Sequence, residues 1–122
     1  MSKRDPKLLI EDILDSAHKI LDYTNNLTLD DFISDSKTVD AVARNFEIIG
    51  EAASRIPEAF RAGYPDIEWR RIIGLRNRIV HDYFGIDYEV VWKIKTDYLP
   101  KLNKSVFLQM VLFVFIITIA KV

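Results

Sequence analysis

The chain has 122 residues, of which 49% are hydrophobic and 29% charged, and its formal net charge at pH 7 is −1. This apolar content suffices for the core of one globular domain, and the near-zero charge does not suggest a general nucleic-acid binder. Because cysteine is absent, a disulfide framework, a thiolate zinc site and thiol catalysis are excluded. The start of the chain lacks an apolar signal segment, so a cytoplasmic protein is expected.

The spacing of apolar residues predicts helices rather than strands, since few runs alternate with a period of two. A first helix is predicted over residues 7–23, and Thr28 resembles the cap of a short helical turn. Ser36 is expected to cap a long second helix that ends near residue 56. Gly50 borders the apolar side of this helix, where it allows another helix to approach closely.

A third helix is predicted from Asp66, its expected cap, to about His81. Its apolar residues recur at helical spacing on one face, and Arg76 falls on that same face. Arg76 is therefore expected to point into the packed side of the helix. The face consists of Trp69, Ile72, Ile73, Arg76, Ile79, Val80 and Tyr83.

Two interpretations of a buried Arg76 are open, because a guanidinium away from water needs a carboxylate or a polar cleft. In the first, Arg76 forms a structural ion pair with Glu47 or Glu51 of the second helix. In the second, Arg76 lies in a cleft at a seam between two protein chains, where it receives a phosphate.

Asp87 is expected to begin a fourth helix after a turn that contains Gly85, and Pro100 fits the kink or the first turn of a fifth. Helices with short connections and no internal repeat predict an all-α fold, an up-and-down antiparallel bundle of four to five helices. Residues 1–104 are assigned to this bundle, and residues 105–122 to an atypical apolar tail that extends the last helix.

The tail has no charged side chain between Val106 and Ala120. A helix of that length spans about 22 Å, less than the ~30 Å of a membrane's hydrocarbon core. A membrane span is therefore not expected, and the run lacks the polar face of an interfacial helix. A helix that is apolar all round must be buried, which favours packing against a partner chain.

Arg76, His81 and Tyr83 place a permanent cation, a proton shuttle and a phenol within a short stretch of chain. Arginine matches phosphate with a planar fork of donors, and histidine can accept and donate a proton near pH 7. This combination suits cleavage of a phosphodiester without a metal, and Asn77 is a candidate to orient the substrate or Arg76. The other histidine, His18, is interpreted as a surface residue, and no carboxylates are grouped around either histidine to suggest a metal site.

Charge is distributed unevenly along the chain. Residues 1–66 have eight Lys and Arg against thirteen Asp and Glu, whereas residues 67–122 have nine against five. The half that contains the motif is therefore the basic half. Its cations are either ordinary solvated helix faces or a modest phosphate-attracting surface.

Several ordered blocks of sequence resemble the HepT-like branch of the HEPN superfamily, the small helical toxins of prokaryotic toxin–antitoxin pairs. The blocks are SKRDP at residues 2–6, RNFEIIGEAA at 44–53, YPDIEW at 64–69 and GLRNRIVHDYF at 74–84. The resemblance covers roughly residues 1–101. After about Lys101 the family's charged last helix is replaced by the apolar tail, a departure that bears on dimer contacts and leaves the motif untouched.

The resemblance implies a helical bundle that dimerises, or forms a higher oligomer, and acts as a metal-independent endoribonuclease without a cofactor. The family motif, Arg-x4-His-x-Tyr, corresponds to Arg76, His81 and Tyr83 and lines a cleft between protomers. RNA cleavage needs a base, an acid and a cation. One protomer offers one suitable histidine, so two Arg76–His81 pairs are expected to meet in one composite cleft.

The partner that the resemblance implies is a minimal nucleotidyltransferase antitoxin, which in some such pairs silences the toxin by adding AMP to the motif tyrosine, here Tyr83. A core aromatic is the alternative interpretation of Tyr83. Arg44, Glu47 and Glu51 are expected to support the site from the second helix. In the alternative function, the chain is a non-catalytic helical partner that docks the nucleotidyltransferase.

Overall fold

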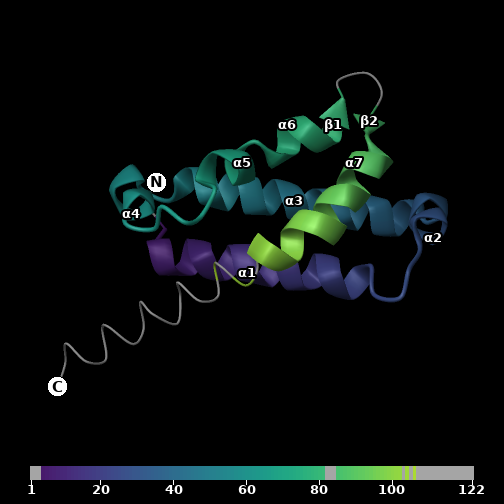
Figure 1. Cartoon of the computed structure of the whole chain (residues 1–122), viewed down its shortest axis with the longest axis horizontal. Helices are drawn as coiled ribbons and strands as arrows, with labels where there is room; N and C mark the ends of the chain where they lie inside the picture. Colours follow the sequence, from purple (N-terminus) through teal and green to yellow (C-terminus); the bar gives the residue numbers. More distant parts are fainter. Residues whose placement is uncertain (1–3, 82–84, 103, 105, 107–122) are drawn as a thin grey trace.

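The computed structural model describes residues 4–81, 85–102, 104 and 106, with residues 80 and 81 described by their backbone alone. Two long helices, α1 (Pro6–Tyr23) and α3 (Ser36–Arg55), form its centre. They run antiparallel and lie side by side along most of their length (Figure 1). The first two predicted helices are thus confirmed, with ends that differ from the predicted ones by one residue.

Side-chain caps fix the turn between these two helices. Thr28 and Asp31 form a reciprocal capping box at the start of α2 (Leu29–Ser34). At the start of α3, the carboxylate of Asp35 accepts a hydrogen bond from the N–H of Thr38 at 3.2 Å. The prediction of Ser36 as the cap was therefore wrong by one residue. A charged acceptor bonds the orphan N–H groups more strongly than a hydroxyl does, so Asp35 is the cap and Ser36 the first helical residue.

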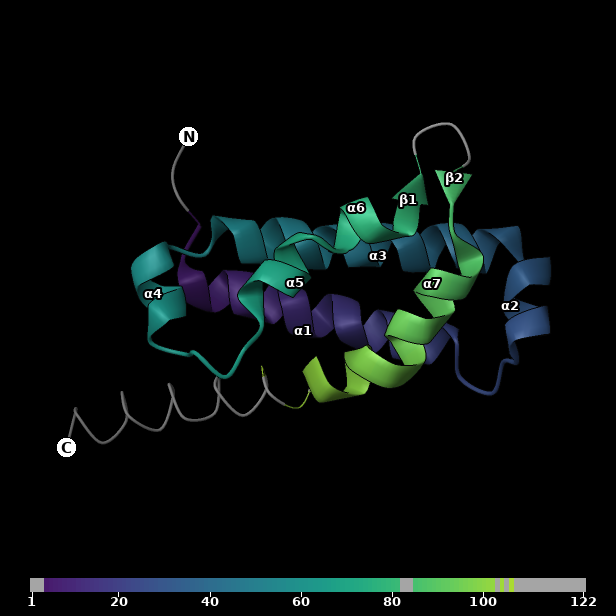
Figure 2. The same ribbon diagram turned by 45° about the horizontal axis from the view of Figure 1, so that its top comes forward.

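A second layer of short segments covers one side of the long helix pair (Figure 2). In this layer α4 (Glu58–Ala62), α5 (Trp69–Ile73) and α6 (Leu75–Ile79) follow α3, and α7 (Tyr88–Lys93) comes after a hairpin. Of these segments, α5 and α6 make the most contacts with α3. The all-α bundle is confirmed, and the described residues form it from two long helices and several short ones.

The predicted third helix is divided into two short helices. Gly74 ends α5, and α6 ends at Ile79. Glycine costs roughly 1 kcal/mol relative to alanine inside a helix, so the break falls where the helix is weakest. The residue that caps α5 is Glu68, without a side-chain hydrogen bond, and not Asp66 as predicted.

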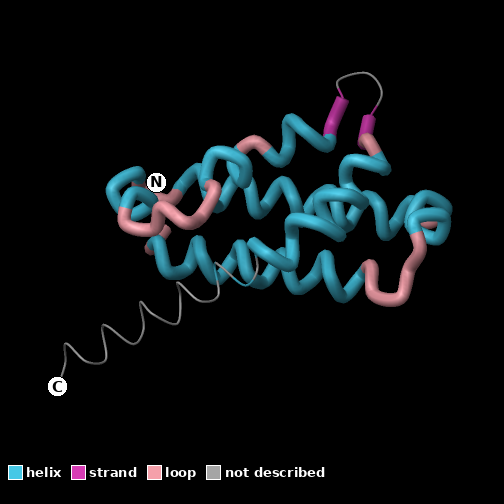
Figure 3. The backbone as a smooth tube through the Cα atoms, in the orientation of Figure 1, coloured by secondary structure: helices cyan, strands magenta, loops and turns pink. Residues whose placement is uncertain are grey.

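After α6 the chain forms a short hairpin that the sequence did not predict (Figure 3). Strand β1 (Val80–His81) pairs antiparallel with β2 (Gly85–Ile86), so that His81 lies opposite Gly85. Gly85 has a φ of 74°, a left-handed conformation that glycine adopts without strain. The hairpin is closed by a hydrogen bond at 2.9 Å from the N–H of Asp87 to the carbonyl of Ile79.

Asp87 caps α7, as predicted, by accepting a hydrogen bond from the N–H of Val90 at 3.1 Å. The helical path continues through a π-helical turn, η1 (Ile94–Tyr98), into residues 99–102. Pro100 therefore lies inside a continuous helical path and not in the first turn of a separate fifth helix. Proline lacks an N–H and clashes with the carbonyl four residues earlier. The wider π turn just before Pro100 relaxes this conflict.

The apolar tail, with the predicted packing against a partner chain, lies outside the described residues except for Val106. Within the described part of the chain, no helix is long and apolar enough to cross a membrane.

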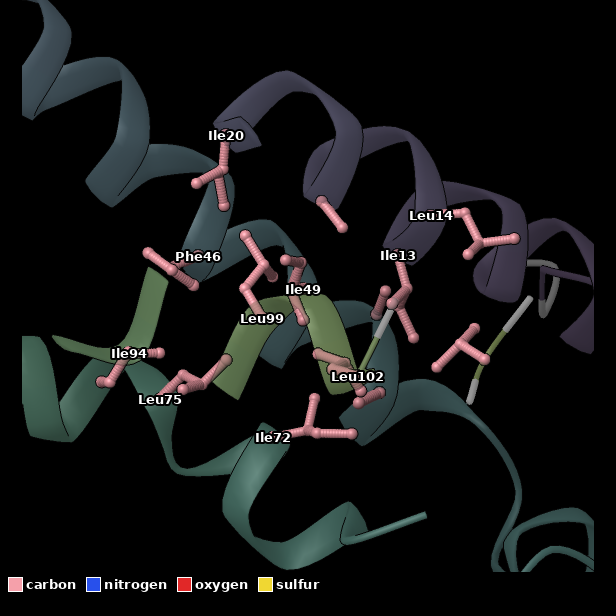
Figure 4. Packing of buried hydrophobic residues seen from close by; sticks show 14 of the residues in the cluster. Ile13, Leu14, Ile20, Phe46, Ile49, Ile72, Leu75, Ile94, Leu99 and Leu102 are labelled. Carbon is pink, nitrogen blue, oxygen red and sulfur yellow. The ribbon is translucent and has the colours of Figure 1, made fainter. Parts of the chain in front are cut away.

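A single apolar core joins the two layers. The side chains in Figure 4 come from α1, α3, the α5–α6 segment and the helical path after α7, and they meet between the layers. Leu75 and Ile79 of α6 are fully buried in this core. The labelled residues are Ile13, Leu14, Ile20, Phe46, Ile49, Ile72, Leu75, Ile94, Leu99 and Leu102.

Gly50 allows α5 to approach α3 closely, as predicted. A Cβ atom at this position would lie 3.2 Å from the carbonyl oxygen of Ile72 and 3.3 Å from that of Ile73. Both contacts are with backbone atoms of α5, which cannot rotate away as a side chain would. The contact therefore fixes the distance between α3 and the segment that leads into α6.

We expect Gly50→Val to lower the free energy of unfolding by about 2–3 kcal/mol, because the branched side chain forces α5 away from α3. Urea denaturation followed by circular dichroism measures this change. Ala59→Val, at an exposed helical position on α4, is the control for the helix propensity of valine. Equal losses in the two variants would show that the close approach is unimportant for stability.

Candidate active site

Arg76 is exposed and not buried as predicted. The buried stripe of this segment consists of Ile72, Leu75 and Ile79, which are each 0% exposed. Ile72 and Ile79 belong to the predicted face, and Leu75 takes the buried place between them that was predicted for Arg76. Burial of Leu75 in place of Arg76 avoids the cost of removing a guanidinium from water.

The predicted ion pair between Arg76 and a glutamate of α3 is also absent from the described residues. Glu47 instead pairs with Arg44, with its Oε2 atom 3.3 Å from the arginine Nη1. Glu51 pairs with Arg55, with 3.5 Å between Oε1 and Nη2. Each pair joins residues three or four apart on the same helix, whose side chains are already neighbours on the helix surface. No carboxylate of the described residues lies within ion-pair distance of Arg76.

Arg76 nevertheless lies in a cleft with the α3 residues that were expected to support it. The cleft has a volume of about 430 Å³ and separates α3 from the α5–α6 segment. Five α3 residues at helical spacing form one wall, and residues around the break at Gly74 form the other. The lining residues are Arg44, Glu47, Gly50, Glu51, Ser54, Ile73, Arg76 and Asn77.

This arrangement follows from the break in the predicted helix. Because Leu75 is turned into the core, the next two side chains, Arg76 and Asn77, are directed outward beside α3. Gly50 lines the same cleft, so the close approach of α3 and α5 also sets its depth. Arg76 can thus offer its donors to a ligand in the cleft, with Glu47 and Glu51 on the opposite wall.

His81 is placed by the hairpin and not by a helix. Its backbone belongs to β1, two residues beyond the end of α6, and pairs with Gly85. The 140° separation between Arg76 and His81 that a continuous helix would impose therefore does not apply. Tyr83 lies outside the described residues, so its predicted place beside Arg76 stays a prediction, as does the meeting of the Arg76 and His81 side chains.

Neither the burial of Leu75 nor the hairpin was predicted from the sequence, and only the first could have been recognised in it. Leu75 is more hydrophobic than Arg76 and stands at helical spacing from Ile72 and Ile79, so the alternative stripe was visible. The hairpin left no alternating pattern, because its strands have only two residues each. Within the described residues, no group of three or more His, Asp and Glu side chains is arranged to hold a metal ion.

Comparison with known proteins assigns the chain to a family. The family model described as "Ribonuclease HepT-like" matches residues 13–107. A protein named "Putative RNase MJ1380", from Methanocaldococcus jannaschii, is 43% identical over 106 residues, which cover 87% of this chain and 97% of that protein. A protein named "Probable ribonuclease HepT", from Thermococcus cleftensis, is 40% identical over 101 residues, which cover 83% and 92% of the two chains. No solved structure gives a significant match.

The chain belongs to the ribonuclease HepT-like family of the HEPN superfamily. The resemblance found in the sequence is confirmed, and so is the predicted class of enzyme, a ribonuclease.

Proposed function

We propose that the chain is a metal-independent endoribonuclease toxin of a toxin–antitoxin pair, which cleaves RNA with Arg76 and His81. The observation that carries this proposal is an exposed arginine, free of carboxylate partners among the described residues, in a cleft of a HepT-like chain. An arginine that receives a substrate phosphate must be open to solvent, and its planar fork of donors matches phosphate geometry. Family relatives named as ribonucleases support RNA as the substrate.

The proposed reaction uses the nucleophile that RNA itself provides. The 2′-hydroxyl attacks the adjacent phosphorus, a new bond forms between the 2′-oxygen and phosphorus, and the bond to the 5′-oxygen breaks. A base accepts the proton of the 2′-hydroxyl, and an acid donates a proton to the departing 5′-oxygen. Arg76 stabilises the extra negative charge of the phosphorane. The products carry a 2′,3′-cyclic phosphate and a 5′-hydroxyl.

The acid and the base are the His81 side chains of two protomers. A two-fold axis close to the hairpin brings the same residues of both chains to one cleft. This shared cleft then has two arginines and two histidines. In this assembly Asn77 binds the RNA or orients Arg76. Arg44, Glu47 and Glu51 form the polar wall opposite, with the two glutamates held by arginines of α3.

The proposed partner is a nucleotidyltransferase antitoxin that inactivates the chain by adding AMP to Tyr83. Tyr83 lies two residues beyond His81 in the sequence. A nucleotide attached there adds bulk and a phosphate close to the motif, so it blocks RNA and offers Arg76 a competing anion. The alternative function, a non-catalytic partner of the nucleotidyltransferase, predicts no cleavage of RNA at all.

Incubation of the wild-type protein with RNA in an excess of chelator tests the nuclease activity. We expect cleavage without added metal, because the arginine and the histidines provide the charge and the proton transfers. Mass spectrometry of the fragments should show 2′,3′-cyclic phosphates and 5′-hydroxyls. A DNA of the same sequence is the matched control, since it lacks the 2′-hydroxyl and should stay intact. Products with 5′-phosphates, or a strict need for a divalent ion, would contradict the mechanism.

A further inference from the structure

Arg78 lies only two residues from Arg76 but lines a different hollow. Residues two apart on a helix are separated by about 200°, so the two arginines face opposite sides of α6. The second hollow has a volume of about 420 Å³ and is bounded by α5, α6, α7 and η1. Among the described residues, neither Arg76 nor the polar wall of the cleft lines it.

We name this hollow the basic groove and define it by Arg71, Arg78, Lys93, Tyr98 and Lys101. Four cationic side chains line it, against one carboxylate, that of Asp97. A smaller hollow of about 340 Å³ continues it toward residues 66–68 and shares Arg71, Tyr98 and Lys101 with it. The groove is thus an open channel on the surface, with an excess of positive charge at the end next to α6.

Three of the four cations in the basic groove have no carboxylate partner in the part of the chain that the structure describes. Within the described residues, Arg78, Lys93 and Lys101 form no ion pair, and all three side chains are exposed. Like charges gathered in one hollow repel one another, and a bound polyanion relieves this repulsion. The three cations come from different segments, α6, α7 and the helical path after η1, so they are brought together by the fold and not by local sequence.

The fourth cation, Arg71, is held in position before any ligand binds. Its guanidinium lies over the ring of Tyr98, 5.7 Å from the ring centroid, and its Nη1 donates a hydrogen bond to Glu68 at 3.1 Å. Burial, the charge of Glu68 and a hydrogen bond to Glu68 raise the pKa of Tyr98 to about 12, so this phenol has no negative charge that would repel a phosphate. A guanidinium stacked on an aromatic ring loses less rotational freedom when it binds a phosphate.

We infer that the basic groove binds the phosphate backbone of the RNA strand beyond the cleavage site. The inference rests on the proposed function for the identity of the polyanion. A strand that leaves the cleft at Arg76 has only to cross α6, whose diameter with side chains is about 10–12 Å, to reach Arg78. Contacts with phosphates carry no base preference, so the groove gives affinity and direction to the strand and leaves the choice of sequence to other contacts.

A binding measurement with RNA that cannot be cleaved tests the groove separately from catalysis. The probe is a labelled 2′-O-methyl oligoribonucleotide in chelator, with fluorescence anisotropy followed over a range of salt concentrations. For the double variant Arg78→Ala/Lys93→Ala, we expect affinity to fall by about tenfold or more. The slope of log affinity against log salt should become shallower by about 1.4, since two phosphate contacts are lost.

The matched control is Lys37→Ala/Arg70→Ala, which removes one lysine and one arginine, both exposed, from outside the groove. It should bind as the wild type does. Equal losses in the two double variants, or no loss in the groove variant, would overturn the inference, as would a wild type that does not bind the probe. A groove variant with unchanged affinity and an altered oligomeric state would assign the groove to contact with another polypeptide. A wild type that binds this probe but leaves cleavable RNA intact would contradict the proposed nuclease activity and leave the inference about the groove standing.

Discussion

Replacement of Arg76 by alanine should lower kcat for RNA cleavage by about 10²–10³-fold, the usual cost of removing one donor from a developing oxyanion. The effect should be greater on kcat than on KM, because the phosphorane carries more negative charge than the substrate phosphate. Stability should change by less than about 0.5 kcal/mol, since the side chain is exposed and unpaired among the described residues. Initial rates in chelator, with melting curves beside them, measure both effects.

Arg70→Ala is the matched control for Arg76→Ala. Arg70 is also an exposed arginine of the α5–α6 segment, but it lines neither the cleft nor the basic groove. Its loss should leave kcat unchanged, so a general effect of net charge on RNA binding is separated from a local one. Arg76→Lys should retain part of the activity, because lysine supplies a point charge without the planar fork. Full activity in Arg76→Ala would remove this residue from the mechanism.

The fold could be predicted from the sequence where a pattern repeats over many residues. The helices α1 and α3 each bury a stripe that recurs over several turns, so an error at one residue does not change the conclusion. The role of Gly50 was also predictable, because a glycine beside an apolar stripe has few other uses in a helix. Local signals of this kind also predicted the caps Thr28 and Asp87. They failed by one or two residues for α3 and α5, which Asp35 and Glu68 cap.

The face of α6 could not be predicted in the same way. Once Gly74 divides the helix, only five residues remain in α6, and in so short a segment two stripes fit the spacing equally well. The energetic difference between burying Leu75 and burying Arg76 decides between them, and it depends on the core that α6 meets. The spacing of apolar residues is a property of the segment alone, whereas which of them is buried depends on the rest of the fold.

The wrong prediction of the buried face of α6 also changes the interpretation of the site. A buried Arg76 would need a partner from α3, and the glutamates of that helix were the obvious candidates. In the structure these glutamates are held by arginines of their own helix, which leaves Arg76 open to the cleft. The α3 residues expected around Arg76 line the same cleft, although the described residues form no ion pair between them and Arg76. Which α3 residues lie near Arg76 depends on which helices are in contact. A rotation of one short helix about its own axis does not change that.

A mixture of wild-type and His81→Ala chains should retain a smaller fraction of the RNA-cleaving activity than the fraction of its chains that are wild type. If each cleft needs the histidines of both protomers, only dimers of two wild-type chains are active. After subunit exchange at equal concentrations these make up about a quarter of the dimers, so activity should fall to about a quarter of that of the same total amount of wild type. Sites that lie within single chains would instead leave about half.

The measurement is the initial rate of RNA cleavage in chelator as the fraction of His81→Ala chains is raised at a constant total concentration. A composite cleft predicts a rate that follows the square of the wild-type fraction, and independent sites predict a straight line. Mixtures with Arg70→Ala chains are the control for mixing with another variant and should keep full activity at every ratio. The squared dependence also requires dimers that exchange subunits, so a linear response from chains shown to be dimeric and to exchange would place both proton transfers within one protomer.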